Sequence, residues 1–223
     1  MEERERESVV LTWNELAQRS RGRPHLGFLK VDADRLGQVF ARGLADRDTI
    51  SRQATLNREI NLFFSGWVQH LLTESRFSDC YPLFCGGDDV LVVGPWDAIA
   101  NLAGTIREDY RAFTAYNPDL TLSAGVLIAE SHYPVCQAAK EVEKALEQAK
   151  ERGRDRISIL GAVLRWQDWA EVYQEWERLH DILQGERAPS ALLHRLLRYG
   201  QMWRAYRDGR DPLGLRAQPL LAY

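Results

Sequence analysis

The stretch Tyr81-Pro-Leu-Phe-Cys-Gly-Gly-Asp-Asp-Val-Leu-Val-Val-Gly94 places two acidic residues directly after a pair of glycines, between two apolar runs. Leu, Phe and Val are typical of buried β-strands, and glycine allows the positive φ angle that a tight turn requires. The stretch therefore predicts a β-hairpin with Asp88 and Asp89 at its tip. Since side chains alternate across a strand, we expect one carboxylate to face the open side of the sheet and the other to lie nearer its edge. The alternative is an ordinary turn, in which Gly and Asp are common.

A second apolar run that ends in acidic residues is Leu26-Gly-Phe-Leu-Lys-Val-Asp-Ala-Asp34. Asp34 has the position of a cap for a following helix, whereas Asp32 lies too far from that helix to cap it. If this strand pairs with the hairpin, Asp32 approaches Asp88 and Asp89. Three carboxylates at close range repel one another unless a divalent cation is bound. Such a cluster predicts Mg²⁺ or Mn²⁺ and is typical of phosphoryl-transfer enzymes.

The composition is that of a globular domain large enough to be an enzyme. Of the 223 residues, 45% are hydrophobic and 27% are charged, and no window approaches the roughly 18 apolar residues of a membrane span. The charged N-terminal run has no apolar segment behind it, unlike a secretory signal, and the three cysteines lack the spacing of a zinc site. We therefore expect a cytoplasmic protein with reduced thiols. The formal net charge of −3 argues against a surface that binds nucleic acid by phosphate neutralisation alone.

Strand and helix patterns alternate along most of the chain. Besides the hairpin, the expected strands are residues 26–31, 120–128 and 156–160, and the expected helices are residues 35–45, 50–72, 95–116 and 134–151. This order indicates the α+β class and a ferredoxin-like or palm fold, in which an antiparallel sheet carries helices on one face. We expect the other face to be open and to carry the acidic residues.

A change of character follows the last expected strand. Trp and Leu recur at helical spacing from residue 166 to residue 183, residues 185–189 interrupt the pattern, and a second helical pattern begins at residue 190. We therefore expect a palm domain in residues 1–162 and a small α-helical domain in residues 163–223. The tail stops without completing a helix, so we expect this second domain to be truncated.

Four motifs in this order resemble the large subunit of type III CRISPR effector complexes, and most closely its Csm (III-A) branch. The motifs are Leu29-Lys-Val-Asp-Ala-Asp-Arg-Leu-Gly37, Cys85-Gly-Gly-Asp-Asp89, Leu122-Ser-Ala-Gly125 and residues 145–150. Residues 32–160 resemble the second palm domain of that subunit, which is itself similar to nucleotidyl cyclases, and residues 166–223 resemble the small helical domain after it. One departure is Cys85, which stands where the family usually has Ser.

The resemblance implies a nucleotidyltransferase that converts ATP to cyclic oligoadenylate second messengers in antiviral defence. It implies that Asp32, Asp88 and Asp89 are catalytic and bind the metal together with Ala33. The implied nucleotide contacts are Gly86, Gly87, Ser51, Arg52, Ser123 and Lys150. From the residues alone, Lys150 is explained as a basic side chain that complements the dipole of a helix end, and Ser51 and Arg52 as part of a solvated helix face.

The resemblance also implies partners, because active sites in this family form between two palms. The chain has neither the nuclease domain nor the first palm of the family. We therefore expect a second palm as partner, either the missing first palm or a second copy of this chain. The other effector subunits, with guide RNA and target RNA, are expected partners in a full complex. One alternative is a homodimeric minimal CRISPR-type polymerase or cyclic-dinucleotide synthase. Another is a catalytically idle nucleotide-binding scaffold, but the intact acidic residues argue against this second alternative.

Overall fold

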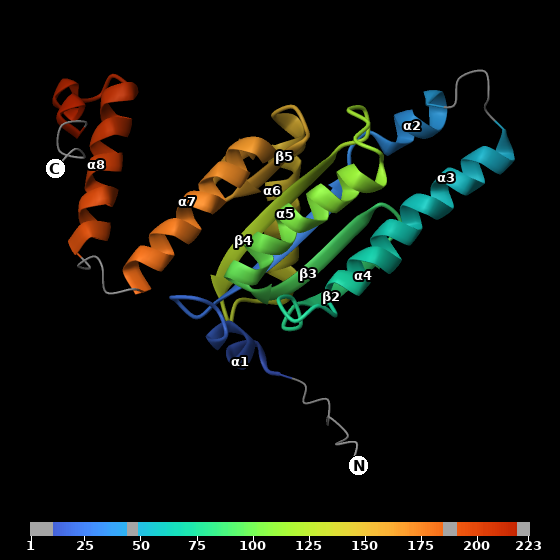
Figure 1. The fold of residues 1–223 in the computed structure, drawn as a ribbon, viewed down its shortest axis with the longest axis horizontal. Helices are drawn as coiled ribbons and strands as arrows, with labels where there is room; N and C mark the ends of the chain where they lie inside the picture. The colour runs from blue at the N-terminus through green and yellow to red at the C-terminus, as the bar shows by residue number, and fades with distance from the viewer. Residues whose placement is uncertain (1–10, 44–48, 185–190, 218–223) are drawn as a thin grey trace, which may run out of the picture. The chain divides into compact units, whose positions relative to one another are not determined.

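The computed structural model describes residues 11–43, 49–184 and 191–217 (Figure 1). Its elements are α1 (Trp13–Gln18), β1 (His25–Ala33), α2 (Leu36–Arg42), α3 (Ile50–Leu62), the π-helical segment η2 (Phe63–Trp67), α4 (Val68–Leu71), β2 (Tyr81–Gly86), β3 (Asp89–Pro95), α5 (Trp96–Phe113), β4 (Leu122–Glu130), α6 (Val135–Glu151), β5 (Arg156–Ile159), β6 (Ala162–Arg165), α7 (Trp166–Gln184), α8 (Ala191–Arg207) and the 3-10 segment η3 (Pro212–Arg216). Four segments lie outside the described residues: the charged N-terminal run, the end of the helix expected at residues 35–45, the interruption at 185–189 and most of the tail.

A six-stranded sheet in the order β2-β3-β1-β4-β5-β6 forms the centre of the palm. β1 pairs antiparallel with β3 and with β4, and β2 pairs antiparallel with β3. These four strands have the order of the ferredoxin-like fold, so the predicted α+β class is confirmed. The sheet is mixed rather than antiparallel throughout, because β5 joins β4 in parallel. β6 pairs with β5 at the edge, so the strand expected at residues 156–160 is not the last one.

The predicted hairpin is formed by β2 and β3. β2 ends at Gly86, β3 begins at Asp89, and these two residues are paired across the hairpin. Gly87 in the turn has a φ angle of +64°, which a residue with a side chain adopts only at a cost. The two glycines therefore serve the turn in different ways, because Gly86 ends the strand and Gly87 reverses the chain.

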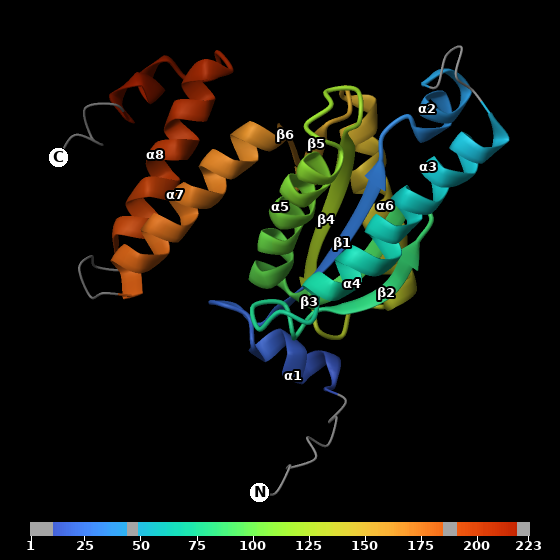
Figure 2. The ribbon, with the colours of Figure 1, turned by 45° about the vertical axis from the view of Figure 1, so that its right-hand side comes forward.

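Helices cover both faces of the sheet (Figures 1 and 2). α5 packs on the face that carries Gly27, where an added Cβ would lie 2.7 Å from the Cβ of Ile99. α6 packs on the other face, where a Cβ at Gly125 would lie 2.5 Å from backbone atoms of Val142 and Leu146. The expectation of one open face is therefore wrong where α6 lies. The physical reason is that β4 and β5 are parallel, and parallel neighbours need a crossover helix that packs on the sheet.

Apolar side chains fill the space between the sheet and the helices on both faces. On the α6 face the buried cluster consists of Leu16, Ala17, Leu26, Phe28, Val93, Ala129, Ala138 and Val142. On the α5 face, the π-helical turn places the consecutive rings of Phe63 and Phe64 against Tyr110, at centroid distances of 5.2 and 5.8 Å. The helix expected at residues 50–72 is thus interrupted by η2, a local feature that apolar spacing did not indicate.

The chain divides into two compact units, Met1–Ala170 and Glu171–Tyr223. The first unit includes the start of α7, where the buried indole of Trp166 donates a hydrogen bond of 2.9 Å to the carbonyl of Leu122. In the second unit, η3 packs on α8 so closely that a Cβ at Gly214 would lie 2.1 Å from the carbonyl oxygen of Met202. The extents of the two domains stay a prediction.

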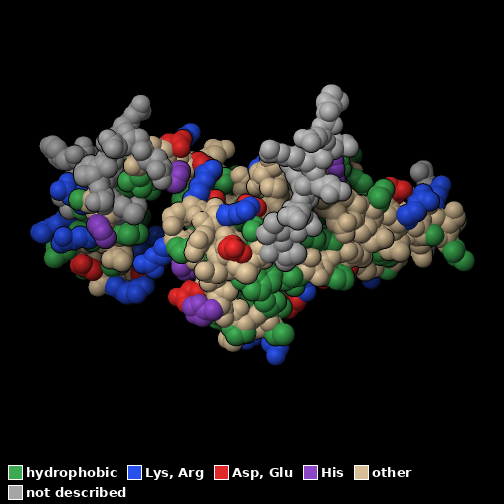
Figure 3. Space-filling view, turned by 90° about the horizontal axis from the view of Figure 1, so that it is seen from below, with side chains coloured by type: hydrophobic (Ala, Val, Ile, Leu, Met, Phe, Trp, Pro, Cys, Tyr) green, Lys and Arg blue, Asp and Glu red, His purple; other side chains and the backbone are tan. Residues whose placement is uncertain are grey.

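Two surface properties bear on the sequence-based expectations. Among the described helices, none combines the length and the apolar character that a membrane span requires. On the face in Figure 3, acidic and basic side chains are interspersed over the surface that is not grey. This mixture agrees with the small net charge of −3.

Candidate active site

Asp32, Asp88 and Asp89 lie where the end of β1 meets the hairpin. β1 and β3 are neighbours, and Asp32 is paired in register with Asp89. Paired residues of adjacent strands point to the same face, so these two carboxylates share one surface. Asp88 lies in the turn, and its backbone carbonyl accepts a hydrogen bond of 3.1 Å from the N–H of Ala33. The sequence predicted an acidic cluster only if these two strands are neighbours, and in the structure they are.

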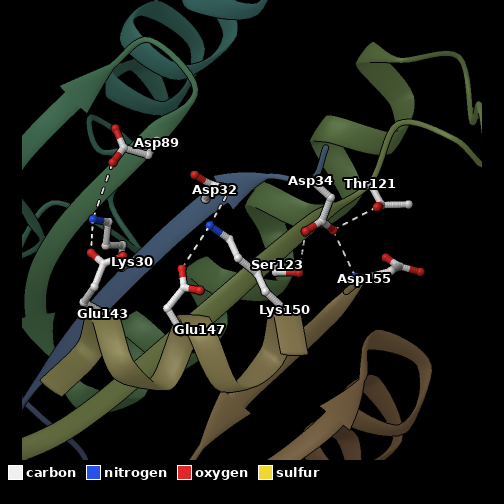
Figure 4. A network of polar contacts seen from close by, with 10 residues as sticks. All are labelled: Lys30, Asp32, Asp34, Asp89, Thr121, Ser123, Glu143, Glu147, Lys150 and Asp155. Carbon is white, nitrogen blue, oxygen red and sulfur yellow. Dashed lines mark hydrogen bonds and ion pairs between the residues drawn. The ribbon is translucent and has the colours of Figure 1, made fainter. Parts of the chain in front are cut away.

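Lys150 lies beside Asp32 at the end of α6 (Figure 4). Its ammonium nitrogen is 3.0 Å from the carboxylate of Asp32 and 3.4 Å from that of Glu147. The Lys150 side chain is about one-fifth exposed, so this pair is shielded but still reachable from solvent. A helix-terminus charge alone would not need this partner on the sheet, and the position of Lys150 therefore suits a contact to an anion bound near Asp32.

A second lysine, Lys30 of β1, stands in the same relation to Asp89. Its ammonium nitrogen is 3.5 Å from the Asp89 carboxylate and forms an ion pair with Glu143 of α6. Figure 4 shows the two lysines side by side, each between a carboxylate of the sheet and a glutamate of α6. Sequence reasoning missed Lys30 and Glu143. The only sequence signal was the cationic residue two positions before Asp32, which places both side chains on one face of β1.

Burial and the neighbouring charged groups shift the pKa of the site's carboxyl groups in opposite directions. Burial raises the pKa of the Asp32 carboxyl above its ordinary value; Lys150 counteracts the shift, and the negative charges of Asp88 and Asp34 add to it. Burial is also the main reason why the pKa of Asp89 is raised. The two lysines thus offset only part of the cost of holding these carboxylates ionised, and an added cation would stabilise their charged forms.

The donor set fits a hard divalent cation such as Mg²⁺ or Mn²⁺. Carboxylate oxygens and backbone carbonyls are the ligands that these ions prefer, and Asp32, Asp88, Asp89 and the backbone of Ala33 offer both kinds. Within the ranges that the structure describes, no three acidic, His or Cys side chains are already gathered around one point. Asp32 is instead paired with Lys150, so binding of a cation there requires this lysine to exchange its partner.

The turn of the hairpin is held by a residue that sequence reasoning missed. The side-chain carbonyl of Asn61 in α3 accepts a hydrogen bond of 2.9 Å from the N–H of Gly87. A Cβ at Gly87 would meet nothing within 4 Å, and one at Gly86 would meet only the ring of Phe84 at 3.9 Å. The space over the two glycines is therefore open to a ligand. A polar residue on an exposed helix gave no signal that Asn61 reaches the turn.

The other expected nucleotide contacts are one buried residue on the strand beside Asp32, Ser123, and two exposed residues of α3. Ser123 is fully buried, and its hydroxyl donates a hydrogen bond of 2.8 Å to Asp34. Ser51 and Arg52 are exposed in the first turn of α3. Asn61, which reaches the hairpin, is about 14–15 Å further along the helix at 1.5 Å per residue. The structure thus places the three aspartates, the two glycines and Lys150 at one end of the sheet, with Ser123 beside Asp32. That Ser51, Arg52 and Ser123 contact the nucleotide stays a prediction.

Asp34 does not cap the following helix, so that expectation is wrong. The residue at the N-cap of α2 is Arg35, with φ +55° and no side-chain capping bond. Asp34 is instead 3% exposed and accepts hydrogen bonds from Thr121, Ser123 and the backbone of Asp155. The left-handed turn at Arg35 directs the chain away from the sheet, while the Asp34 side chain stays at its end.

Comparison with known proteins places this fold and site in a family. Residues 25–158 match the family model described as Cas10/Cmr2, second palm domain. The chain belongs to this family. The resemblance inferred from the four motifs is therefore confirmed, and the acidic hairpin and its neighbouring strand lie inside the matched part of this Cas10/Cmr2 palm.

Individual relatives of this Cas10/Cmr2 palm are larger proteins. The CRISPR system single-strand-specific deoxyribonuclease Cas10/Csm1 (subtype III-A) of Methanocaldococcus jannaschii is 33% identical over 210 residues, which cover 82% of this chain and 26% of the relative. A crystal structure of a Csm1-Csm4 cassette in complex with AMPPNP has a TM-score of 0.79 at 25% identity and covers 93% of this chain and 33% of that one. A crystal structure of a Csm1-Csm4 cassette in complex with cA4 has a TM-score of 0.77 at 26% identity and covers 95% of this chain and 33% of that one. The chain thus spans about a quarter of the length of such curated relatives.

Proposed function

We propose that this palm binds ATP and joins it into cyclic oligoadenylates, as the second palm of a type III-A CRISPR effector. The observation that carries the proposal is the pairing of Asp32 with Asp89 across β1 and β3, with Lys150 at 3.0 Å from Asp32. The similar cassettes described with AMPPNP, an ATP analogue, and with cA4, a cyclic oligoadenylate, support this substrate and product class.

In this proposal Asp32, Asp88 and Asp89, with the backbone of Ala33, hold Mg²⁺ or Mn²⁺. When bound, such an ion neutralises charge on the phosphates and on the attacking oxygen. Lys150 is the residue that changes partner. In the structure it neutralises Asp32, and in the complex it binds the triphosphate as a point charge.

Lys30 and Glu143 have a supporting role in the same proposal. Lys30 is shared between Asp89 and Glu143, so it keeps one anionic partner when Asp89 binds a metal. Gly86 and Gly87 leave open space in which the triphosphate can approach the backbone. The chain's own residues thus bind and orient the nucleotide. Lys150 pairs with the triphosphate when it leaves Asp32, and Lys30 keeps Glu143 when Asp89 binds the metal.

A second palm completes the proposed site. Each transfer joins a 3′-oxygen to the α-phosphorus of ATP and releases pyrophosphate. It needs the attacking 3′-hydroxyl in line with the α-phosphate, and one palm holds only the donor triphosphate. We propose that the acceptor nucleotide is held by another palm, either a first palm of the same effector or a second copy of this chain. A Csm4-type subunit and RNA of the effector are the further proposed partners, since the similar structures are Csm1-Csm4 cassettes.

The test is to incubate the chain with each of the four labelled NTPs and Mg²⁺ or Mn²⁺, alone and with an added first palm and Csm4-type subunit, and to resolve the products. We expect cyclic products from ATP and none from the other three NTPs. Cyclic dinucleotides from another NTP would favour the dinucleotide-synthase alternative. ATP binding without a product under any pairing would favour the scaffold.

Lys150→Met supplies the residue-level test, with Lys140→Met as a matched control on an exposed position of the same helix. The loss of one phosphate-binding charge should weaken Mn²⁺-ATP binding about tenfold, since hydrogen bonds to charged groups contribute about 1.5–3 kcal/mol. Adenosine binding should not change, and Lys140→Met should change neither affinity. Equal losses for ATP and adenosine would return Lys150 to the role of a helix-end charge.

A further inference from the structure

We infer that Asp34 is a positioning residue that sets the location of Lys150 beside Asp32. The inference rests on the proposed function, in which Lys150 binds the triphosphate. Asp34 lies directly after β1, two residues beyond Asp32, and is 3% exposed. A carboxylate so deeply buried is costly unless its oxygens are hydrogen-bonded, so its partners indicate what it does.

The partners of Asp34 come from two other segments (Figure 4). The hydroxyl groups of Thr121 and Ser123 each donate to it at 2.8 Å, from the start of β4. The N–H of Asp155 donates to it at 3.0 Å, from the loop between α6 and β5. Its own N–H donates to the carbonyl of Thr121 at 2.8 Å. Asp34 therefore connects the end of β1 to β4 and to the loop that follows Lys150.

That loop has an unfavourable backbone conformation. Gly153, Arg154 and Asp155 have successive φ angles of +123°, +63° and +48°. Residues with side chains rarely adopt such angles, and they persist where the surrounding structure over-determines them. The N–H of Arg154 bonds back to Ala149 of α6 at 3.2 Å, whereas the N–H of Asp155 bonds to Asp34. The Ala149 bond thus holds the loop to α6, and the Asp34 bond holds its last residue, directly before β5.

The position of Lys150 depends on the Asp34–Asp155 hydrogen bond because Lys150 lies in the last turn of α6, immediately before the loop. Earlier in α6, the backbone at Val142 and Leu146 is fixed by close packing on Gly125. After α6, the chain enters β5 at Arg156, and the Asp34 bond fixes the backbone one residue before that strand. Without it, the last turn can move relative to Asp32, and a misplacement of about 1 Å is enough to cost a large factor in a preorganised site.

The same contacts argue against Asp34 as a further metal ligand. One of its carboxylate oxygens accepts from Thr121 and Asp155 and the other accepts from Ser123. Both oxygens are thus engaged inside the protein, on a side chain that is almost fully buried. Asp34 acts on the ligand through Lys150 rather than by contact with it.

The test compares two replacements of Asp34. Asp34→Ala removes all three acceptor contacts. Asp34→Asn retains them in altered form, because its amide oxygen can accept from Thr121 and Asp155 while its NH₂ group donates to the Ser123 oxygen. We expect Asp34→Ala to weaken Mn²⁺-ATP binding about tenfold without weakening adenosine binding, and Asp34→Asn to restore most of the affinity. No rescue by Asp34→Asn would overturn the inference.

A double-mutant cycle with Lys150→Met separates positioning from general destabilisation. If Asp34 acts through Lys150, Asp34→Ala has no further effect on ATP affinity in the Lys150→Met background. Additive losses would show that Asp34 acts by another route and overturn the inference. Should Asp34→Ala fail to fold, Thr121→Val removes one donor at similar volume, and we expect a smaller loss that likewise disappears with Lys150→Met.

Hydrogen exchange distinguishes a failure of this inference from a failure of the proposed function. If the unaltered chain does not prefer Mn²⁺-ATP to adenosine, the proposed function fails. The effect of the Asp34 hydrogen bond on the backbone can still be measured without a ligand. The measured quantity is the exchange rate of the amides from the last turn of α6 to Asp155. Asp34→Ala should accelerate this exchange and Asp34→Asn should restore it. Exchange that is unchanged in Asp34→Ala would overturn the inference.

Discussion

Replacing Gly125 with alanine tests whether the packing of α6 on β4 determines the geometry of the site. Gly125 lies opposite Lys30 in the sheet and faces α6. An added Cβ would lie 2.5 Å from the nitrogen of Leu146, 2.5 Å from the oxygen of Val142 and 3.0 Å from the carbonyl carbon of Ala145. All three are backbone atoms, so no side-chain rotation relieves the clash. An ordinary contact begins at 3.4 Å, so α6 must move outward by about 0.9 Å.

The expected cost follows from the size of this overlap. Overpacking of a dense core costs about 1–3 kcal/mol, and a rigid helix backbone places Gly125→Ala towards the upper end. The lower entropy of the unfolded alanine chain offsets about 0.4–1 kcal/mol of this. We therefore expect the free energy of unfolding to fall by about 2 kcal/mol. In a chain of this size, that corresponds to a decrease in Tm of about 4–8 °C.

Thermal and urea denaturation, followed by circular dichroism, measure this effect. Gly104→Ala in α5 is the matched control, because its Cβ would lie 3.8 Å from the Trp169 indole nitrogen, an ordinary contact. Inside a helix, this replacement should be neutral or stabilise by up to about 1 kcal/mol. If Gly125→Ala melts at the same temperature as the unaltered chain, α6 can move away from β4 at no cost, and its packing does not fix the geometry of the site.

Three further predictions concern the acidic tip, the start of α7 and the second palm. Asp88→Ala with Asp89→Ala should abolish Mn²⁺-dependent ATP binding in calorimetry without lowering Tm, because burial, and to a smaller extent the charge of Asp88, raises the pKa of Asp89; retained metal-dependent affinity would contradict the site. Trp166→Phe keeps a buried ring but removes the hydrogen bond to Leu122, which should cost about 1–3 kcal/mol in urea denaturation; an unchanged urea midpoint would contradict this. Specific activity of the isolated chain should rise with its concentration, and full activity in a sample that light scattering shows to be monomeric would refute the need for a second palm.

The sequence by itself determined the features that depend on neighbouring residues. The alternation of apolar runs, the glycine pair and the acidic residues predicted the hairpin, the strand beside it and the α+β class. The sequence placed Asp32 near Asp88 and Asp89 on the condition that the two strands are neighbours, and the structure supplies both that pairing and the register of Asp32 with Asp89. Local pattern and tertiary structure agree for these elements, whereas the π-helical segment η2 and the edge strand β6 were not indicated by apolar spacing.

Only the tertiary structure decided which partners the charged residues have. Lys30 and Glu143 are 113 positions apart, and Asp34 and Asp155 are 121 positions apart. Asp34 had the local position of a helix cap, but its carboxylate is bonded across the sheet to β4 and to the loop after α6. The reason is that α6 packs on the face expected to be open, as the parallel pairing of β4 and β5 requires. No local spacing encodes that crossover, and it is the crossover that carries Lys150 to Asp32.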